Sequence, residues 1–269
     1  MISQSQSFRL SINQKAFLLF LAILLVFLVV WELGVERKIF LPIMPSASQT
    51  LKDSWFWFTN PFFYDGPNDQ GLGLLLLTSL KRVVTGFLLG SAIAVPLGVI
   101  TGLSPIASKA IDPFIQILRP VSPLAWLPLG LALMRDSERT ALFIIAITSV
   151  WPTLANTKFA VSNVDPAYIN VARTLGASRW RTIYKVILPA AAPNIIAGLR
   201  ISFGIAWLVI VAAEIILGGG VGYFVWNEWN NLKISSIITA IFVIGLVGLI
   251  LDRLFGLLQT WVSFGQRAS

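Results

Sequence analysis

Long apolar segments separated by short polar ones are the main pattern along this chain. Six segments approach or exceed the roughly 20 residues that a helix needs to cross a bilayer. They cover residues 16–33, 83–103, 113–134, 140–160, 190–213 and 235–258. We therefore predict an all-α, polytopic helical membrane protein with about six transmembrane helices.

The third apolar segment begins with Pro113 and has three further prolines inside it, Pro120, Pro123 and Pro128. A proline inside a helix removes a backbone donor and kinks or breaks the helix. Irregular backbone at membrane depth is tolerated only against protein or beside a water-filled cavity. This segment is therefore predicted to be a broken helix that faces the interior of the bundle.

The stretches between the spans are predicted to be connections. Residues 34–74 form an extracytoplasmic connection whose aromatic cluster, 55–64, lies at the bilayer interface, with partner docking as the alternative. A short helix at 72–80 leads into the second span, and 104–112 and 214–233 are loops. Residues 1–33 hold a cytoplasmic N-terminus and a retained anchor helix, since no A-x-A cleavage site follows the apolar run. The transmembrane core of the chain then covers residues 75–262, and residues 263–269 form a cytoplasmic tail.

The longest polar and basic interruption in the second half of the chain is residues 165–189. Asp165 is expected to cap a helix that begins with Pro166 and ends at Gly176. Ser178 is expected to cap a second helix that Pro189 ends. The apolar positions of the second helix, which have the spacing of one helical face, are Trp180, Ile183, Tyr184 and Ile187.

Three interpretations of this segment follow from its residues. Its cations could meet lipid phosphates at the membrane surface, or the segment could dock a soluble protein. A DNA-binding helix-turn-helix is disfavoured, because spans pack closely on both sides and would block access to a groove. The residues alone leave the first two interpretations open.

Composition narrows the chemistry. The chain is 56% hydrophobic and 12% charged, whereas soluble domains carry about 25% charged residues. It contains no Cys and no His, so it lacks thiol nucleophiles, imidazole bases and the usual transition-metal ligands. No G-x-x-x-x-G-K-[ST] motif occurs, so energy must come from a partner or a gradient. We expect no catalytic residue, no bound cofactor and no metal site.

Charge distribution sets the expected orientation. The net charge of +8 is typical of a membrane protein whose cytoplasmic loops are rich in Lys and Arg. The densest cluster of cations lies in residues 165–189. We therefore place this segment and both termini in the cytoplasm, although the total excess of cations on that side is small.

Charges inside the spans are candidates for function, because they are costly in a membrane. Arg119 and Arg200 could line an anion path, or each could snorkel to an interface or pair with a neighbour. Glu214 would repel an anion and more plausibly pairs with an outer-loop Arg or receives a binding protein. With the proline-broken span, the candidate path residues are Arg119, Pro123, Arg200 and Glu214.

The residues of the polar segment 165–189 have the same spacing as a known sequence motif. Binding-protein-dependent ABC importer permeases carry Glu-Ala-Ala, three residues, Gly, nine residues and Ile-x-Leu-Pro between two spans. The matching positions here are Asn170, Val171, Ala172, Gly176, Val186, Leu188 and Pro189. The first Glu and first Ala are replaced, and Val stands for Ile. The chain resembles this family over about residues 75–262. The runs ARTLGASRWR and VILPAAAP resemble the subgroup that moves nitrate, bicarbonate, sulfonates and taurine.

This resemblance implies a type I ABC importer permease fold with cytoplasmic coupling helices at 165–189. It implies a homodimer with a second permease copy, two ABC ATPase subunits that hold ATP and Mg, and a periplasmic or lipid-anchored solute-binding protein. The implied cellular location is the bacterial inner membrane, where the protein contacts membrane lipids and does not bind nucleic acid. The residues implied in ATPase coupling are Asn170, Ala172, Arg173, Gly176, Arg179, Arg181 and Pro189.

Within the subgroup we rank nitrate or nitrite first, bicarbonate second and sulfonate or taurine third. The rival classes are a gradient-driven anion carrier or channel and a membrane scaffold that transports nothing. Gradient-driven carriers commonly show internal repeats, and none is evident in this sequence.

Overall fold

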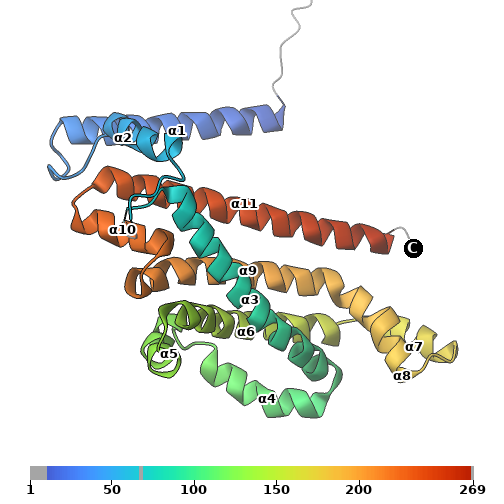
Figure 1. The fold of residues 1–269 in the computed structure, drawn as a ribbon. Helices are drawn as coiled ribbons and strands as arrows, with labels where there is room; N and C mark the ends of the chain where they lie inside the picture. The colour runs from blue at the N-terminus through green and yellow to red at the C-terminus, as the bar shows by residue number, and fades with distance from the viewer. Residues whose placement is uncertain (1–10, 67–68, 268–269) are drawn as a thin grey trace, which may run out of the picture. The chain divides into compact units, whose positions relative to one another are not determined.

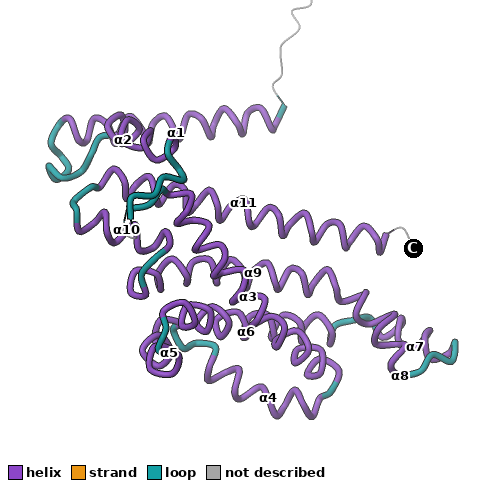
Figure 2. The backbone as a smooth tube through the Cα atoms, in the orientation of Figure 1, coloured by secondary structure: helices purple, strands orange, loops and turns teal. Residues whose placement is uncertain are grey.

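The computed structural model describes residues 11–66 and 69–267, and this part of the chain is almost entirely helical. Five helices in it are long and apolar enough to cross a membrane, and a bent helix pair would make a sixth span. The chain divides into two compact units, Met1–Thr59 with Glu228–Thr239 and Asn60–Asn227 with Ala240–Ser269. Figures 1 and 2 show the helices along the chain.

The first unit contains α1, Ile12–Glu36, and α2, Ala47–Thr59. A capping box of Ser11 and Gln14 starts α1, and most of its apolar side chains are exposed, as expected of a helix that faces lipid. The predicted connection 34–74 contains α2, a helix that the sequence analysis did not predict. Buried Ser54 and Thr239 share a hydrogen bond of 2.6 Å, which ties α2 to the start of α11. The predicted division at residues 33, 74 and 262 stays a prediction.

The core of the second unit is formed by α3, Leu72–Leu103, α6, Ser137–Ser162, and α9, Leu188–Leu217. The expected short helix at 72–80 is the first part of the single 32-residue helix α3. Small residues on α3 face α6, and a Cβ added at Gly90 would lie 2.4 Å from the backbone oxygen of Ala146. Such residues allow helix backbones to approach closely. Phe87 and Phe203 pack edge to face at 5.0 Å between α3 and α9.

The proline-rich third span is broken, as the sequence predicted. It consists of α4, Pro105–Leu118, a 3₁₀ turn at Pro123–Trp126, labelled η1, and α5, Leu127–Met134. The two halves bend by 89°. The expected loop at 104–112 is wrong, because Ser104 caps α4 and Pro105 occupies its first position.

The expected loop at 214–233 is also largely wrong. It contains α10, Gly220–Asn230, which is followed by α11, Ile234–Arg267. Gly218, Gly219 and Gly220 have φ of 82°, 70° and 74°, so three left-handed residues make the sharp turn between α9 and α10. The aromatic residues of this stretch then continue in a regular helix.

Candidate functional site

The first half of the polar segment is a short capped helix, α7, Pro166–Thr174. The Asp165 carboxylate accepts the Ala167 N–H at 2.8 Å, and Gly176 has φ of 73°. The N–H of Ala177 donates to the Ala172 carbonyl at 3.0 Å, and that of Gly176 to the Arg173 carbonyl at 2.9 Å. This pair is a Schellman cap. The predicted start and stop of α7 are therefore confirmed.

The second half does not end where the sequence predicted. Ser178 caps α8, Arg179–Thr182, which runs through a π-helical turn at Ile183–Ile187, labelled η2, directly into α9. Pro189 lies in the first turn of α9 and does not terminate a helix. A proline ring clashes with the carbonyl four residues earlier. The wider π turn just before Pro189 offers a reason why the helix passes through it unbroken.

The four apolar residues of the second helix do not form one buried face. Ile183 and Ile187 are buried against the end of α6, whereas Trp180 and Tyr184 are 68% and 64% exposed. The rings of Trp180 and Tyr184 stack with centroids 6.2 Å apart. Leu175 at the tip of the segment is 80% exposed. Segment 165–189 thus presents an exposed aromatic and apolar surface, a feature that marks protein-binding or membrane-binding sites.

The residues predicted for coupling lie in two settings. Ala172 is buried inside the chain, so the expectation that its small side chain seats a partner has no support from its position. The other predicted residues are exposed, namely Asn170, Arg173, Gly176, Arg179, Arg181 and Pro189. A Cβ added at Gly176 would have no neighbour within 4 Å.

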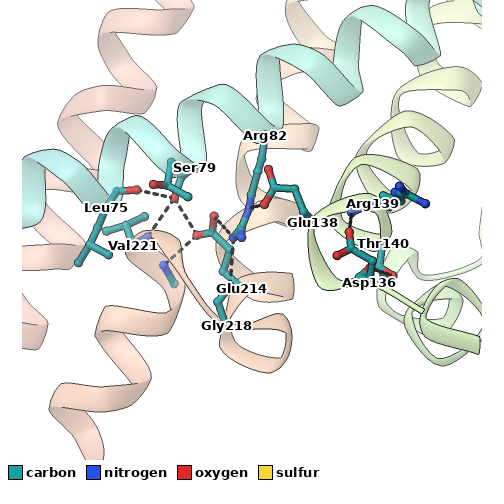
Figure 3. Close-up of polar contacts among 12 residues, drawn as sticks. Leu75, Ser79, Arg82, Asp136, Glu138, Arg139, Thr140, Glu214, Gly218 and Val221 are labelled. Carbon is teal, nitrogen blue, oxygen red and sulfur yellow. Dashed lines mark hydrogen bonds and ion pairs between the residues drawn. The ribbon is translucent and has the colours of Figure 1, made fainter. Parts of the chain in front are cut away.

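A buried ion-pair cluster joins α3, α6 and α9 (Figure 3). Glu214 on α9 is fully buried, and Arg82 on α3 is 6% exposed. The Arg82 guanidinium donates to Glu214 at 3.2 Å, to the Gly218 carbonyl at 3.1 Å and to Glu138 at 2.7 Å. Glu214 therefore pairs with an Arg, as expected, but that Arg lies inside a helix and not in a loop.

The second oxygen of Glu214 accepts from the Ser79 hydroxyl at 2.8 Å and from the Gly222 N–H at 3.0 Å. Ser79 in turn accepts the Val221 N–H at 2.9 Å (Figure 3). The cluster thus fixes the turn between α9 and α10 to α3. Ser79, Arg82 and Glu138 were not singled out from the sequence. The signal was present, since Ser79 and Arg82 are three residues apart and share a helical face.

Two further ion pairs involve the membrane helices of the second unit. The Arg200 guanidinium on α9 donates to both carboxylate oxygens of Asp252 on α11, at 2.6 and 2.5 Å. Lys158 on α6 pairs with Asp112 on α4. Arg200 therefore has the neighbour that the sequence left as one of its alternatives.

Arg119 and Pro123 flank the break in the third span. Arg119 caps the C-terminus of α4, and Pro123 opens η1. The Arg119 side chain is exposed and has no ion pair or hydrogen bond with any residue in the described ranges. The structure thus separates the four candidate path residues. Glu214 and Arg200 are paired, whereas Arg119 and Pro123 lie together at the break.

Residues 94–264 match the family described as "Binding-protein-dependent transport system inner membrane component". The chain belongs to this family. As a binding-protein-dependent permease, it is a multi-pass inner-membrane transport subunit. The nitrate import permease NrtB of Synechocystis sp. is 41% identical over 238 residues, which cover 88% of this chain and 86% of that protein. The bicarbonate transport permease CmpB of the same organism is 40% identical, with 89% and 86% covered.

Solved structures show the same permease fold. The MetNI methionine ABC transporter, in an inward-facing conformation, superimposes with a TM-score of 0.62 at 13% identity, over 69% of this chain and 93% of that one. An amino acid ABC transporter gives 0.59 at 16% identity, over 83% and 99%. The predicted type I ABC importer permease fold is confirmed.

Proposed function

We propose that this permease imports a small oxyanion, with nitrate or nitrite as the first candidate, in an ATP-driven complex. The observation that carries the substrate is the 41% identity with a nitrate import permease over 88% of the chain. Bicarbonate is the second candidate, because a bicarbonate permease is 40% identical over a similar length. Sulfonate or taurine ranks third.

The proposed complex contains two copies of this chain and two cytoplasmic ATPase subunits, with ATP and Mg held by the ATPases. A periplasmic or lipid-anchored binding protein delivers the anion. The chain itself takes no catalytic part, and both of its termini lie in the cytoplasm. Segment 165–189 is the proposed ATPase contact, since it combines exposed aromatic side chains with exposed cations.

The proposed coupling uses the continuity of α8, η2 and α9. Closure of the two ATPases moves Trp180, Tyr184 and the exposed arginines, and the single helix from Arg179 to Leu217 carries this movement into the membrane. The buried contacts of Ile183 and Ile187 with the end of α6 make α6 move with it. The path then opens alternately to the two sides of the membrane.

Uptake by the reconstituted complex tests this function. The permease, its ATPases and its binding protein are placed in a bacterial strain without nitrate or bicarbonate importers. Accumulation of ¹⁵N-nitrate and of ¹⁴C-bicarbonate is then measured. We expect nitrate accumulation that disappears when the phosphate-binding lysine of the ATPase is replaced. Accumulation of bicarbonate alone would select the second candidate. If neither anion accumulates, both leading substrates are wrong, and if the ATPase mutation has no effect, the ATP-driven mechanism is wrong.

A further inference from the structure

Three cations in the membrane helices of the second unit have carboxylate partners within the chain. Arg82 pairs with Glu138 and Glu214, Lys158 with Asp112, and Arg200 with Asp252. Arg119 differs from these three, since its side chain is exposed and unpaired in the part of the chain that is described. A cation in a membrane helix without a partner is costly and is a functional candidate by default.

The irregular backbone beside Arg119 argues against lipid as its surroundings. It follows Asp112 by seven residues along α4, which is about 10 Å of helix rise. Asp112, which pairs with Lys158, lies in the middle of α4, and Arg119 lies at the end of this helix, where the span breaks. Here the backbone is irregular, and the span turns by 89°. Such backbone occurs at membrane depth only against protein or beside water.

Arg200 provides the contrast. The Arg200 guanidinium already makes two parallel hydrogen bonds with the Asp252 carboxylate. Its charge is therefore neutralised, and these two N–H donors are not available to an anion. The guanidinium of Arg119 makes no ion pair with any residue that the structure describes. A planar guanidinium matches planar oxyanions with two parallel hydrogen bonds, and nitrate and bicarbonate are both planar with three oxygens around one atom.

We propose that Arg119, at the break between α4 and η1, is the residue that binds the oxyanion in the translocation path. This inference rests on the proposed oxyanion import. In a homodimer the path carries two copies of this arginine. The break at Pro120 and Pro123 places the side chain beside water, where it exchanges the anion rather than holding it.

The chain contains no cysteine, so an Arg119→Cys substitution gives this chain a single labelling site, which is read on the permease subunit of the complete complex. We expect this cysteine to react quickly with a membrane-impermeant, water-soluble methanethiosulfonate reagent, because the proposed path contains water. Ile117→Cys is the matched control. It lies two residues away on α4 and is 68% exposed, and we expect it to react slowly because it faces lipid. Equal reactivity at both positions would overturn the proposal.

Charge variants add a functional readout. Arg119→Gln is expected to lower nitrate uptake about tenfold or more, because the variant loses the charge that attracts the anion. Arg119→Lys is expected to retain part of the uptake, because it keeps the charge but not the planar guanidinium. Co-purification of the ATPases and ATP hydrolysis stimulated by the binding protein should remain. Loss of the permease dimer in Arg119→Gln would show instead that Arg119 pairs with the second copy. A wild-type complex without uptake would refute the oxyanion importer, while the labelling of Arg119→Cys still reports on the path.

Discussion

The carboxylate of Glu214 accepts one hydrogen bond each from Arg82, Ser79 and Gly222 while having no exposed surface. Removing one partner of a buried ion pair leaves an uncompensated charge, which is costlier than removing both. The cluster therefore stabilises the fold. Arg82 is its central member, because its side chain bonds to Glu138 on α6, to Glu214 on α9 and to the Gly218 carbonyl in the glycine turn.

Arg82→Ala is expected to destabilise the protein by about 3–5 kcal/mol, because it leaves Glu214 charged and unpaired. The measurement is thermal unfolding of the purified complex in detergent. Glu138→Gln is the control, since Glu138 is 45% exposed, and its effect should be much smaller. The double variant Arg82→Gln with Glu214→Gln should be milder than Arg82→Ala. A double variant as unstable as Arg82→Ala would contradict this account.

At the scale of elements, the contact between α3 and α6 depends on small residues. Gly86, Gly90, Ala94, Gly98 and Gly102 recur every four residues along α3. A Cβ added at any of the four glycines would lie within 3.0 Å of an α6 atom. The two helices therefore pack backbone against backbone over most of their length.

Gly90→Leu should separate α3 from α6 and lower the folded yield, at a cost of about 1–3 kcal/mol or more. Gly204→Leu on α9 is the matched control, because a Cβ there has no neighbour within 4 Å. The measurements are the yield of folded protein after membrane extraction and the unfolding temperature, compared between the two variants. Comparable losses in the two variants would show that helix propensity or insertion, rather than packing, is responsible.

For the whole molecule, assembly with the ATPases is the property to test. The double variant Trp180→Ala with Tyr184→Ala should insert normally, since both side chains are exposed, and should lose most of the co-purified ATPase. Leu208→Ala, a side chain on α9 that is 69% exposed, serves as the control. Unchanged ATPase recovery in the double variant would remove segment 165–189 from the proposed interface.

Most of the membrane topology could be predicted from the sequence, because apolar length and proline position act locally. The caps at Asp165, Gly176 and Ser178 were equally readable. Helices α2 and α10 were missed because turn-forming and aromatic residues mask their helical character. The pairing of Arg82 with Glu214 joins residues 132 positions apart, and a spacing rule cannot reveal it. The helix continues past Pro189 because of a π turn just before it, and a π turn has no reliable sequence signal.

The unbroken helix from Arg179 to Leu217 has a mechanical consequence. Its 39 residues correspond to a rod of about 58 Å, longer than the bilayer core is thick. One end carries the exposed aromatic pair of segment 165–189, and the other end carries Glu214, which is anchored to α3 by Arg82. In the proposed coupling, a pull by the ATPases on the first end tilts the helix about the second end, and the ion-pair cluster is the pivot of this tilt.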